Sequence, residues 1–268
     1  MIKPIESEKN YLCSRFFTMR NSTLLIVISL FFWNCTKENS LVFSDEKYEK
    51  ISELGDGEQN SKVTIAIPLA IAENIVSDSI NTTIRTFIEN VIYLNDTPNN
   101  FSSYEELAAS FIDSYEELKK EYPDEVEWEA DVKGKITFQS EKLLNIKLEY
   151  YVFAGGAHGY FGVKSFFFDP KTGKQLTPEE LFSDIEGLTL LAESKFRDKF
   201  KIDKNKNINS QGFMFEDDVF YLPENIFVTD NGILLVYNTY EIASYADGIQ
   251  ELHIPFTEVK PFFKLDIN

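Results

Sequence analysis

The chain has 268 residues, of which 43% are apolar and 15% aromatic, so it holds ample material for a folded core. Its net charge of −18 repels nucleic acid phosphates, and we expect no DNA or RNA partner. Only two cysteines (Cys13 and Cys35) and two histidines (His158 and His253) are present. A disulfide framework and a thiolate or histidine metal site are therefore not expected, and no cofactor is predicted.

Residues 19–35 have the pattern of a targeting signal. Arg20 precedes an uncharged, mostly apolar run over residues 23–33, which is too short to span a bilayer but has the size of a secretory h-region. Cys35 ends the run and a polar segment follows. The pattern resembles a bacterial lipoprotein signal, which implies that Cys35 is the lipidated first residue of the mature chain.

Two features depart from that pattern. Lipoprotein signals usually place small residues before the cysteine, whereas Phe32, Trp33 and Asn34 stand here, so a plain secretory signal or a short uncleaved anchor remains an alternative. Residues 1–18 contain two glutamates where such signals are basic, and we predict that they are an extension ahead of a true start at Met19. Removal of residues 1–34 deletes four basic and two acidic residues and leaves a net charge of −20.

The next part of the chain is predicted to change from a polar tether to regular structure. Residues 36–60 are polar with scattered glycines, and we interpret them as a tether between the lipid and the folded body. Residues 62–70 alternate as a strand does, whereas apolar residues over 73–93 recur at helical spacing. A second helix is predicted from Ser103, whose hydroxyl caps it while Glu106 reaches back, to Pro123. Its acidic outer face indicates a solvated surface rather than a metal site.

Three strands are predicted next, over residues 126–139, 143–153 and 160–168, with a bulge at Gly134. Their close succession favours antiparallel pairing. A helix is predicted from Thr177 to Phe200, then a hairpin around residues 230–232 and a last strand over 249–256. Because helices cluster rather than alternate with strands, we expect an α+β fold with an antiparallel sheet packed against helices.

Several sequence blocks in the second half carry a family resemblance. They are GGAHG (residues 155–159), FDPKTGK (168–174), EELF (179–182), YEIASYADG (240–248) and HIPF (253–256). Their order and spacing resemble the RsiV-like and PdaC N-terminal-like family of bacterial envelope domains, whose biochemical activity is unknown. The resemblance implies two contiguous subdomains, a PdaC-like one over residues 61–147 and an RsiV-like one over residues 148–268.

The resemblance implies a non-catalytic, lipid-anchored binding protein of the cell envelope, placed at the outer membrane. In this family the sigma-binding segment of RsiV and the catalytic domain of PdaC lie outside the shared region, so neither activity is expected here. One relative senses lysozyme, a cationic protein, and the acidic charge of this chain would steer a similar partner toward it. A peptidoglycan-type glycan is the other expected ligand class.

The ligand-binding candidates lie in the glycine turn and in the aromatic segment near the C-terminus. They are Gly155, Gly156, His158, Gly159, Tyr160, Tyr240, Tyr245 and Asp247. A general base at His158 would make the protein a hydrolase, but the sequence shows no nucleophile or orienting partner, and a turn residue is the favoured interpretation. A purely structural envelope lipoprotein is the third alternative. Asp217-Asp218 and Asp230-Asn231-Gly232 lack calcium-loop spacing, and turns are the favoured interpretation.

Overall fold

The computed structural model describes residues 41–55, 60–94 and 101–265. The predicted signal, its Cys35 and the predicted extension over residues 1–18 lie outside the described residues. Among the described helices, none is both long and apolar enough to cross a membrane.

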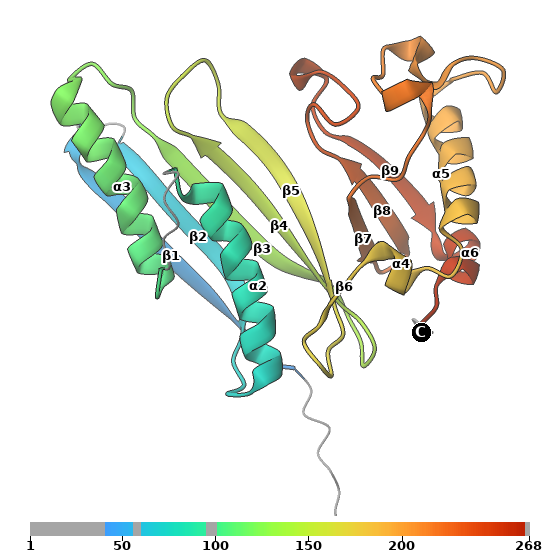
Figure 1. The fold of residues 1–268 in the computed structure, drawn as a ribbon, viewed down its shortest axis with the longest axis horizontal. Helices are drawn as coiled ribbons and strands as arrows, with labels where there is room; N and C mark the ends of the chain where they lie inside the picture. Colours follow the sequence, from blue (N-terminus) through green and yellow to red (C-terminus); the bar gives the residue numbers. More distant parts are fainter. Residues whose placement is uncertain (1–40, 56–59, 95–100, 266–268) are drawn as a thin grey trace, which may run out of the picture. The chain divides into compact units, whose positions relative to one another are not determined.

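The first layer is a six-stranded sheet that carries two long helices on one face (Figure 1). Its strands, in spatial order, are β1 (Phe43–Gly55), β2 (Asn60–Ala70), β3 (Glu129–Gln139), β4 (Leu144–Phe153), β5 (Tyr160–Phe168) and β6 (Gln175–Leu176). The helices are α2 (Ile75–Ile92) and α3 (Tyr104–Glu121). All neighbouring strands are antiparallel except β2 and β3, which are parallel because both helices lie between them in the chain.

Alternating side chains of the sheet and the apolar stripes of α2 and α3 form the first core. Val63, Ile65 and Ile67 of β2 point to the helices, as do Ala130 and Val132 of β3. The facing residues of α2 are Ile80, Ile84, Ile88 and Ile92. Each of these buried isoleucines contributes about 2 kcal/mol through apolar burial.

The start of α3 differs slightly from the predicted capping box. The hydroxyl of Ser103 accepts a hydrogen bond from the backbone N–H of Glu106 at 3.3 Å, as predicted. The Glu106 carboxylate, however, accepts from the backbone and hydroxyl of Ser102, both at 2.8 Å. The Glu106 carboxylate therefore bonds to Ser102 rather than to the backbone of Ser103, and these bonds lower the pKa of Glu106.

The second layer is a three-stranded antiparallel sheet in the order β7 (Asn225–Thr229), β8 (Gly232–Tyr237) and β9 (Gln250–Pro255). The predicted hairpin is confirmed, because Thr229 pairs with Gly232 across it. One face packs on α5 (Ile185–Phe200) and α6 (Phe256–Val259) around the buried ring of Phe196. The short helix α4 (Pro178–Leu181) precedes α5.

The opposite face of the second sheet packs on β5 through Val163, Phe227 and Val236. Side-chain amides complete this junction. The backbone N–H of Ser165 donates to Asn225 Oδ1 at 3.0 Å, and that of Val163 donates to Asn238 Oδ1 at 2.9 Å. The part of the β5 edge that β6 does not pair thus bonds to two asparagine side chains.

The α+β class is confirmed, but several details differ from the prediction. Residues 43–55 form strand β1 rather than tether, because β1 is a charged edge strand that lacks apolar alternation. The register shift in β3 lies between Ile136 and Phe138, not at Gly134, whose missing side chain leaves room for Pro68. The predicted helix over 177–200 breaks between α4 and α5, where Asp184 caps α5. The predicted subdomain boundary between residues 147 and 148 falls inside β4.

Candidate functional site

The glycine turn joins β4 to β5 at one end of the first sheet, the upper end in Figure 1. Gly155 and Gly156 have φ values of +83° and +89°, which side chains rarely adopt. Position 159 requires glycine for a different reason, since a Cβ there would lie 2.5 Å from the ring of Tyr151. The glycines therefore let the turn curl tightly over a tyrosine of β4.

His158 at the tip of this turn contacts the predicted aromatic segment directly. Its ring stacks on that of Tyr245, with centroids 4.3 Å apart and planes 26° apart. The Tyr245 hydroxyl donates to the carbonyl of Gly159 at 3.1 Å, and His158 Nδ1 lies 2.9 Å from the same oxygen. Tyr240 lies next to Tyr245, at 5.7 Å between ring centroids. Residues more than 80 positions apart thus form one cluster.

The aromatic segment lies in the connection between β8 and β9, which is bonded to β5. Asn238 donates to the carbonyl of Val163 at 3.0 Å, and the Thr239 hydroxyl donates to that of Phe161 at 3.3 Å. The Glu241 carboxylate accepts from the backbone N–H of Asn238 at 2.8 Å, and burial raises the pKa of this carboxyl. These bonds place the segment beside the glycine turn.

Large apolar side chains are exposed around the cluster. Tyr160 and Phe161 are each 39% exposed, and Tyr240 is 56% exposed with a φ of +68°. A tyrosine held in a left-handed conformation with its ring in solvent costs about 1 kcal/mol or more, a cost that is common at binding sites. Tyr160 and Phe161 are neighbours in β5 and so point to opposite faces, with Tyr160 on the helix face beside Tyr150. We call His158, Phe161, Tyr240 and Tyr245 the aromatic loop surface.

A run of carboxylates borders this surface. The segment between α3 and β3 contains five acids within nine residues: Glu121, Asp124, Glu125, Glu127 and Glu129. Glu125 accepts a hydrogen bond from the Trp128 indole at 3.0 Å, and a Cβ on Gly155 would lie 2.9 Å from its carboxylate. The segment, here called the acidic segment, therefore adjoins the glycine turn.

The described residues define the surroundings of His158. The contacts of His158 within the described ranges are a carbonyl and a ring; no carboxylate orients it and no hydroxyl nucleophile bonds to it. Across the described residues, no group of three His, Cys, Asp or Glu side chains is arranged to hold a metal ion.

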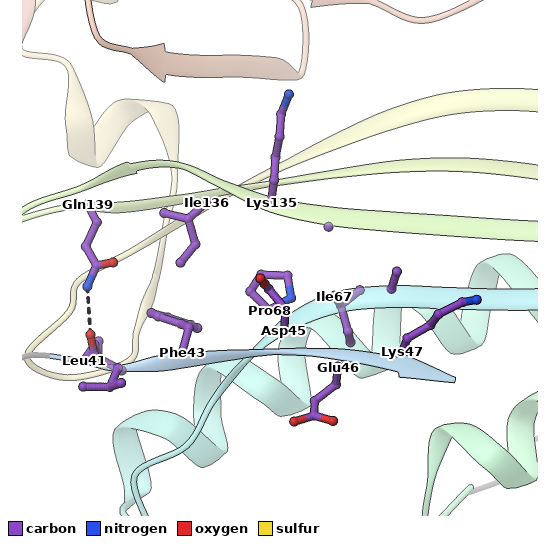
Figure 2. Close-up of a pocket in the computed structure, with 13 residues that line it drawn as sticks. Leu41, Phe43, Asp45, Glu46, Lys47, Ile67, Pro68, Lys135, Ile136 and Gln139 are labelled. Carbon is purple, nitrogen blue, oxygen red and sulfur yellow. Dashed lines mark hydrogen bonds between the residues drawn. The ribbon is translucent and has the colours of Figure 1, made fainter. Parts of the chain in front are cut away.

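A cavity of about 720 Å³ lies elsewhere, where β2 and β3 diverge (Figure 2). Pairing of these strands stops at Ala66 and Lys133, two residues before Pro68, which has no N–H to donate. Leu41, Phe43 and Ile136 line the cavity, and Gln139 closes one side by donating to the carbonyl of Leu41 at 2.9 Å. It shares no lining residue with the aromatic loop surface.

The structure brings together four of the predicted site residues, namely His158, Gly159, Tyr240 and Tyr245. Gly155 and Gly156 shape the turn, and Tyr160 lies beside Tyr150 with ring centroids 6.1 Å apart. Asp247 instead caps a short turn by accepting from the Ser244 hydroxyl at 2.5 Å. The sequence prediction missed the acidic segment, although five acids ahead of a strand were a visible signal.

Two known protein families match separate parts of the chain. Residues 176–257 match the family described as "Protein of unknown function (DUF3298)", and residues 56–160 match the family described as "Deacetylase PdaC". No curated protein matches the chain.

Two crystal structures of DUF3298 family proteins share the fold. One, from Bacteroides fragilis, superposes with a TM-score of 0.63 at 19% identity, over 84% of this chain and 94% of that one. The other, from Pseudomonas aeruginosa, gives a TM-score of 0.57 at 21% identity over the same shares. A PdaC-like part followed by a DUF3298 part is consistent with an RsiV-like and PdaC-like domain of unknown function.

Proposed function

We propose that the protein is a non-catalytic, lipid-anchored binding protein of the cell envelope that captures a cationic protein, such as lysozyme, on the aromatic loop surface. The observation that carries the proposal is the meeting of exposed aromatic rings and the acidic segment at one end of the sheet. Aromatic side chains are frequent interface anchors, and a cluster of carboxylates attracts a basic partner before contact.

The charges and rings have separate roles in this proposal. The acidic segment accelerates encounter over about a Debye length, roughly 8 Å at physiological salt. Tyr240 and Phe161 then lose water against the partner and slow its dissociation. His158 and Tyr245 support this contact by stacking and by fixing the carbonyl of Gly159.

The test is a binding measurement between the full chain and lysozyme at low and high salt. The double variant Asp124→Asn/Glu129→Gln removes two charges from the acidic segment, and we expect it to weaken binding about fivefold or more at low salt. The matched control, Glu186→Gln/Asp198→Asn, removes two exposed charges on α5 and should bind as the wild type does. Equal binding by both variants, or no binding by the wild type at low salt, would contradict the proposal.

A glycan ligand is the second candidate. The exposed rings of Tyr240 and Phe161 favour it, since aromatic faces stack on sugars. The salt dependence separates the two ligand classes. Binding of a basic protein falls as salt rises, whereas binding of peptidoglycan fragments by stacking is little affected. Tyr240→Ala should weaken either ligand, so the salt series, not that variant, decides between them.

Lipid attachment at Cys35 is part of the proposal and rests on the resemblance of residues 19–35 to a lipoprotein signal. Mass spectrometry of the protein extracted from membranes should find a lipid-modified N-terminal cysteine and no residues 1–34. A Cys35→Ser protein should lose this modification. Recovery of an unmodified Cys35 would remove the lipid anchor while leaving the binding proposal intact.

A further inference from the structure

The two ends of the first sheet differ in chemistry. Strand directions place the start of β1 and the ends of β2, β3 and β5 at the end opposite the glycine turn, the lower end in Figure 1. The described chain begins at this lower end, with Leu41. The ten residues of β4 separate the two ends by about 33 Å.

Three aliphatic side chains are exposed together at the lower end. Val42 is 51% exposed, Ile71 55% and Ile75 81%. The backbone N–H of Ile71 donates to the carbonyl of Val42 at 3.0 Å, which holds the start of β1 beside the end of β2. A tight turn, closed by the bond from Asn74 N–H to the carbonyl of Ala72 at 2.9 Å, then presents Ile75 at the first position of α2. We call Val42, Ile71 and Ile75 the aliphatic tip.

Charges of both signs lie in the turns around the aliphatic tip. The turn between β5 and β6 packs on the start of α2, where the Ser79 hydroxyl donates to the carbonyl of Gly173 at 2.9 Å. That turn exposes Lys171, and the turn between β3 and β4 exposes Lys142 beside Glu141. Glu73 is exposed within the tight turn itself, so these lysines offset only part of the repulsion from an anionic lipid surface.

We propose that the aliphatic tip rests on the lipid bilayer, so that the folded body stands with its lower end in the headgroup region. Exposed isoleucine and valine side chains gain free energy by entering the interfacial region, in proportion to the apolar area they bury there. We assign a lipid surface to the tip because the described fold starts there, a few residues after Cys35, the proposed site of lipid attachment. Only residues 36–40 separate Leu41 from Cys35, a reach of about 20 Å.

This orientation has a consequence for the proposed function, on which it partly rests through the lipid at Cys35. The aromatic loop surface lies at the upper end, away from the bilayer, and faces outward toward a soluble partner. A membrane-held body that lay on its side would instead bring one face of the sheet to the lipid.

The test uses the full chain with Cys13→Ser and Cys35→Ser, so that its outcome does not depend on lipid attachment. A single cysteine is introduced by Ile75→Cys, or by Val126→Cys at the upper end as control, and is labelled with a polarity-sensitive nitrobenzofurazan probe. Vesicles of phosphatidylethanolamine and phosphatidylglycerol are added, and floated protein is measured with and without doxyl-labelled lipid. At position 75 we expect emission to rise about twofold and the doxyl lipid to quench it, with neither effect at position 126.

A second pair of variants tests affinity rather than proximity. Ile71→Gln/Ile75→Gln should reduce flotation several-fold, whereas Tyr122→Gln/Val126→Gln, which alters two exposed side chains at the upper end, should not. Floated protein with an unchanged probe at position 75 overturns the proposal, as does failure of the wild type to float. A probe at 75 that is shielded before vesicles are added also overturns it, because another part of the chain would then cover the tip.

Discussion

Glycines in the aromatic loop surface serve two separate physical needs, and the sequence alone does not tell them apart. Gly156 has φ +89° and open space around its Cα, so only backbone strain opposes a side chain there. Gly159 has no positive φ, but the Tyr151 ring occupies the space of a Cβ. The first glycine is needed for conformation and the second for packing.

This difference predicts that the costs of Gly159→Ala and Gly156→Ala respond differently to removal of the Tyr151 ring. Gly159→Ala should lower the free energy of unfolding by about 2 kcal/mol, because its methyl group would overlap the Tyr151 ring. In a Tyr151→Ala background most of that loss should disappear. Gly156→Ala should cost about 1 kcal/mol in both backgrounds. Denaturant unfolding measures all four values, and a Gly159→Ala cost that is unchanged by Tyr151→Ala would show that the overlap is not its cause.

The site residues were predictable one by one but not as a cluster. GGAHG marks a turn with an exposed histidine, and Tyr240 and Tyr245 are recognisable as aromatic anchors. Their contact depends on Asn238, whose amide bonds both to the backbone of Val163 and so fixes one loop on another. Nothing in the spacing of residues 158 and 245 encodes that bond, because it forms only after the two sheets have packed.

Elements with an apolar stripe or alternation were predicted well, and elements without one were missed. α2, α3, β4 and β8 appear in the structure close to their predicted bounds. β1 was not predicted, because this edge strand carries charged side chains in place of apolar alternation. Lys47 and Lys62 both form ion pairs with Glu49 of β1. The parallel pairing of β2 and β3 was missed because it arises from the crossover of two helices, not from either strand.

The connection between β8 and β9 should respond to pH through Glu241. Burial raises the pKa of this carboxyl above its value in the unfolded chain, so the folded state holds the proton more tightly. The resulting stability is fully present below the unfolded pKa and is lost as pH rises through the folded pKa. Burial of this carboxyl therefore costs the fold more stability as pH rises through that range.

We expect Glu241→Gln, which retains an acceptor for the N–H of Asn238, to raise the midpoint of thermal unfolding at about pH 8. The gain over the wild type should shrink as pH falls toward about 4, where both side chains are neutral. Glu186→Gln, at an exposed position on α5, is the control and should show little effect at either pH. A gain that is independent of pH would mean that removal of the charge is not its source.

At the scale of the molecule, the two sheets depend on one buried polar network. Asn145 of β4 is fully buried and bonds on both sides of the junction. Its Oδ1 accepts from the backbone N–H of Val228 in β7 at 2.8 Å, and its Nδ2 donates to the Ser165 hydroxyl at 2.9 Å and the Phe166 carbonyl at 3.0 Å. Separation of the sheets would break the bond between Asn145 and Val228 and expose Phe227 and Val163.

The described fold should therefore unfold in a single cooperative transition, despite its two sheets. Hydrogen exchange in increasing denaturant should release the protected amides of β4 and β8 together. Asn145→Leu should lower the free energy of unfolding by about 3 kcal/mol, since it orphans the buried N–H of Val228 and removes the bonds to Ser165 and Phe166. Asn205→Ala, at an exposed loop position, is the control. If β8 loses protection well before β4 in the wild type, the network joins the sheets without coupling their stability.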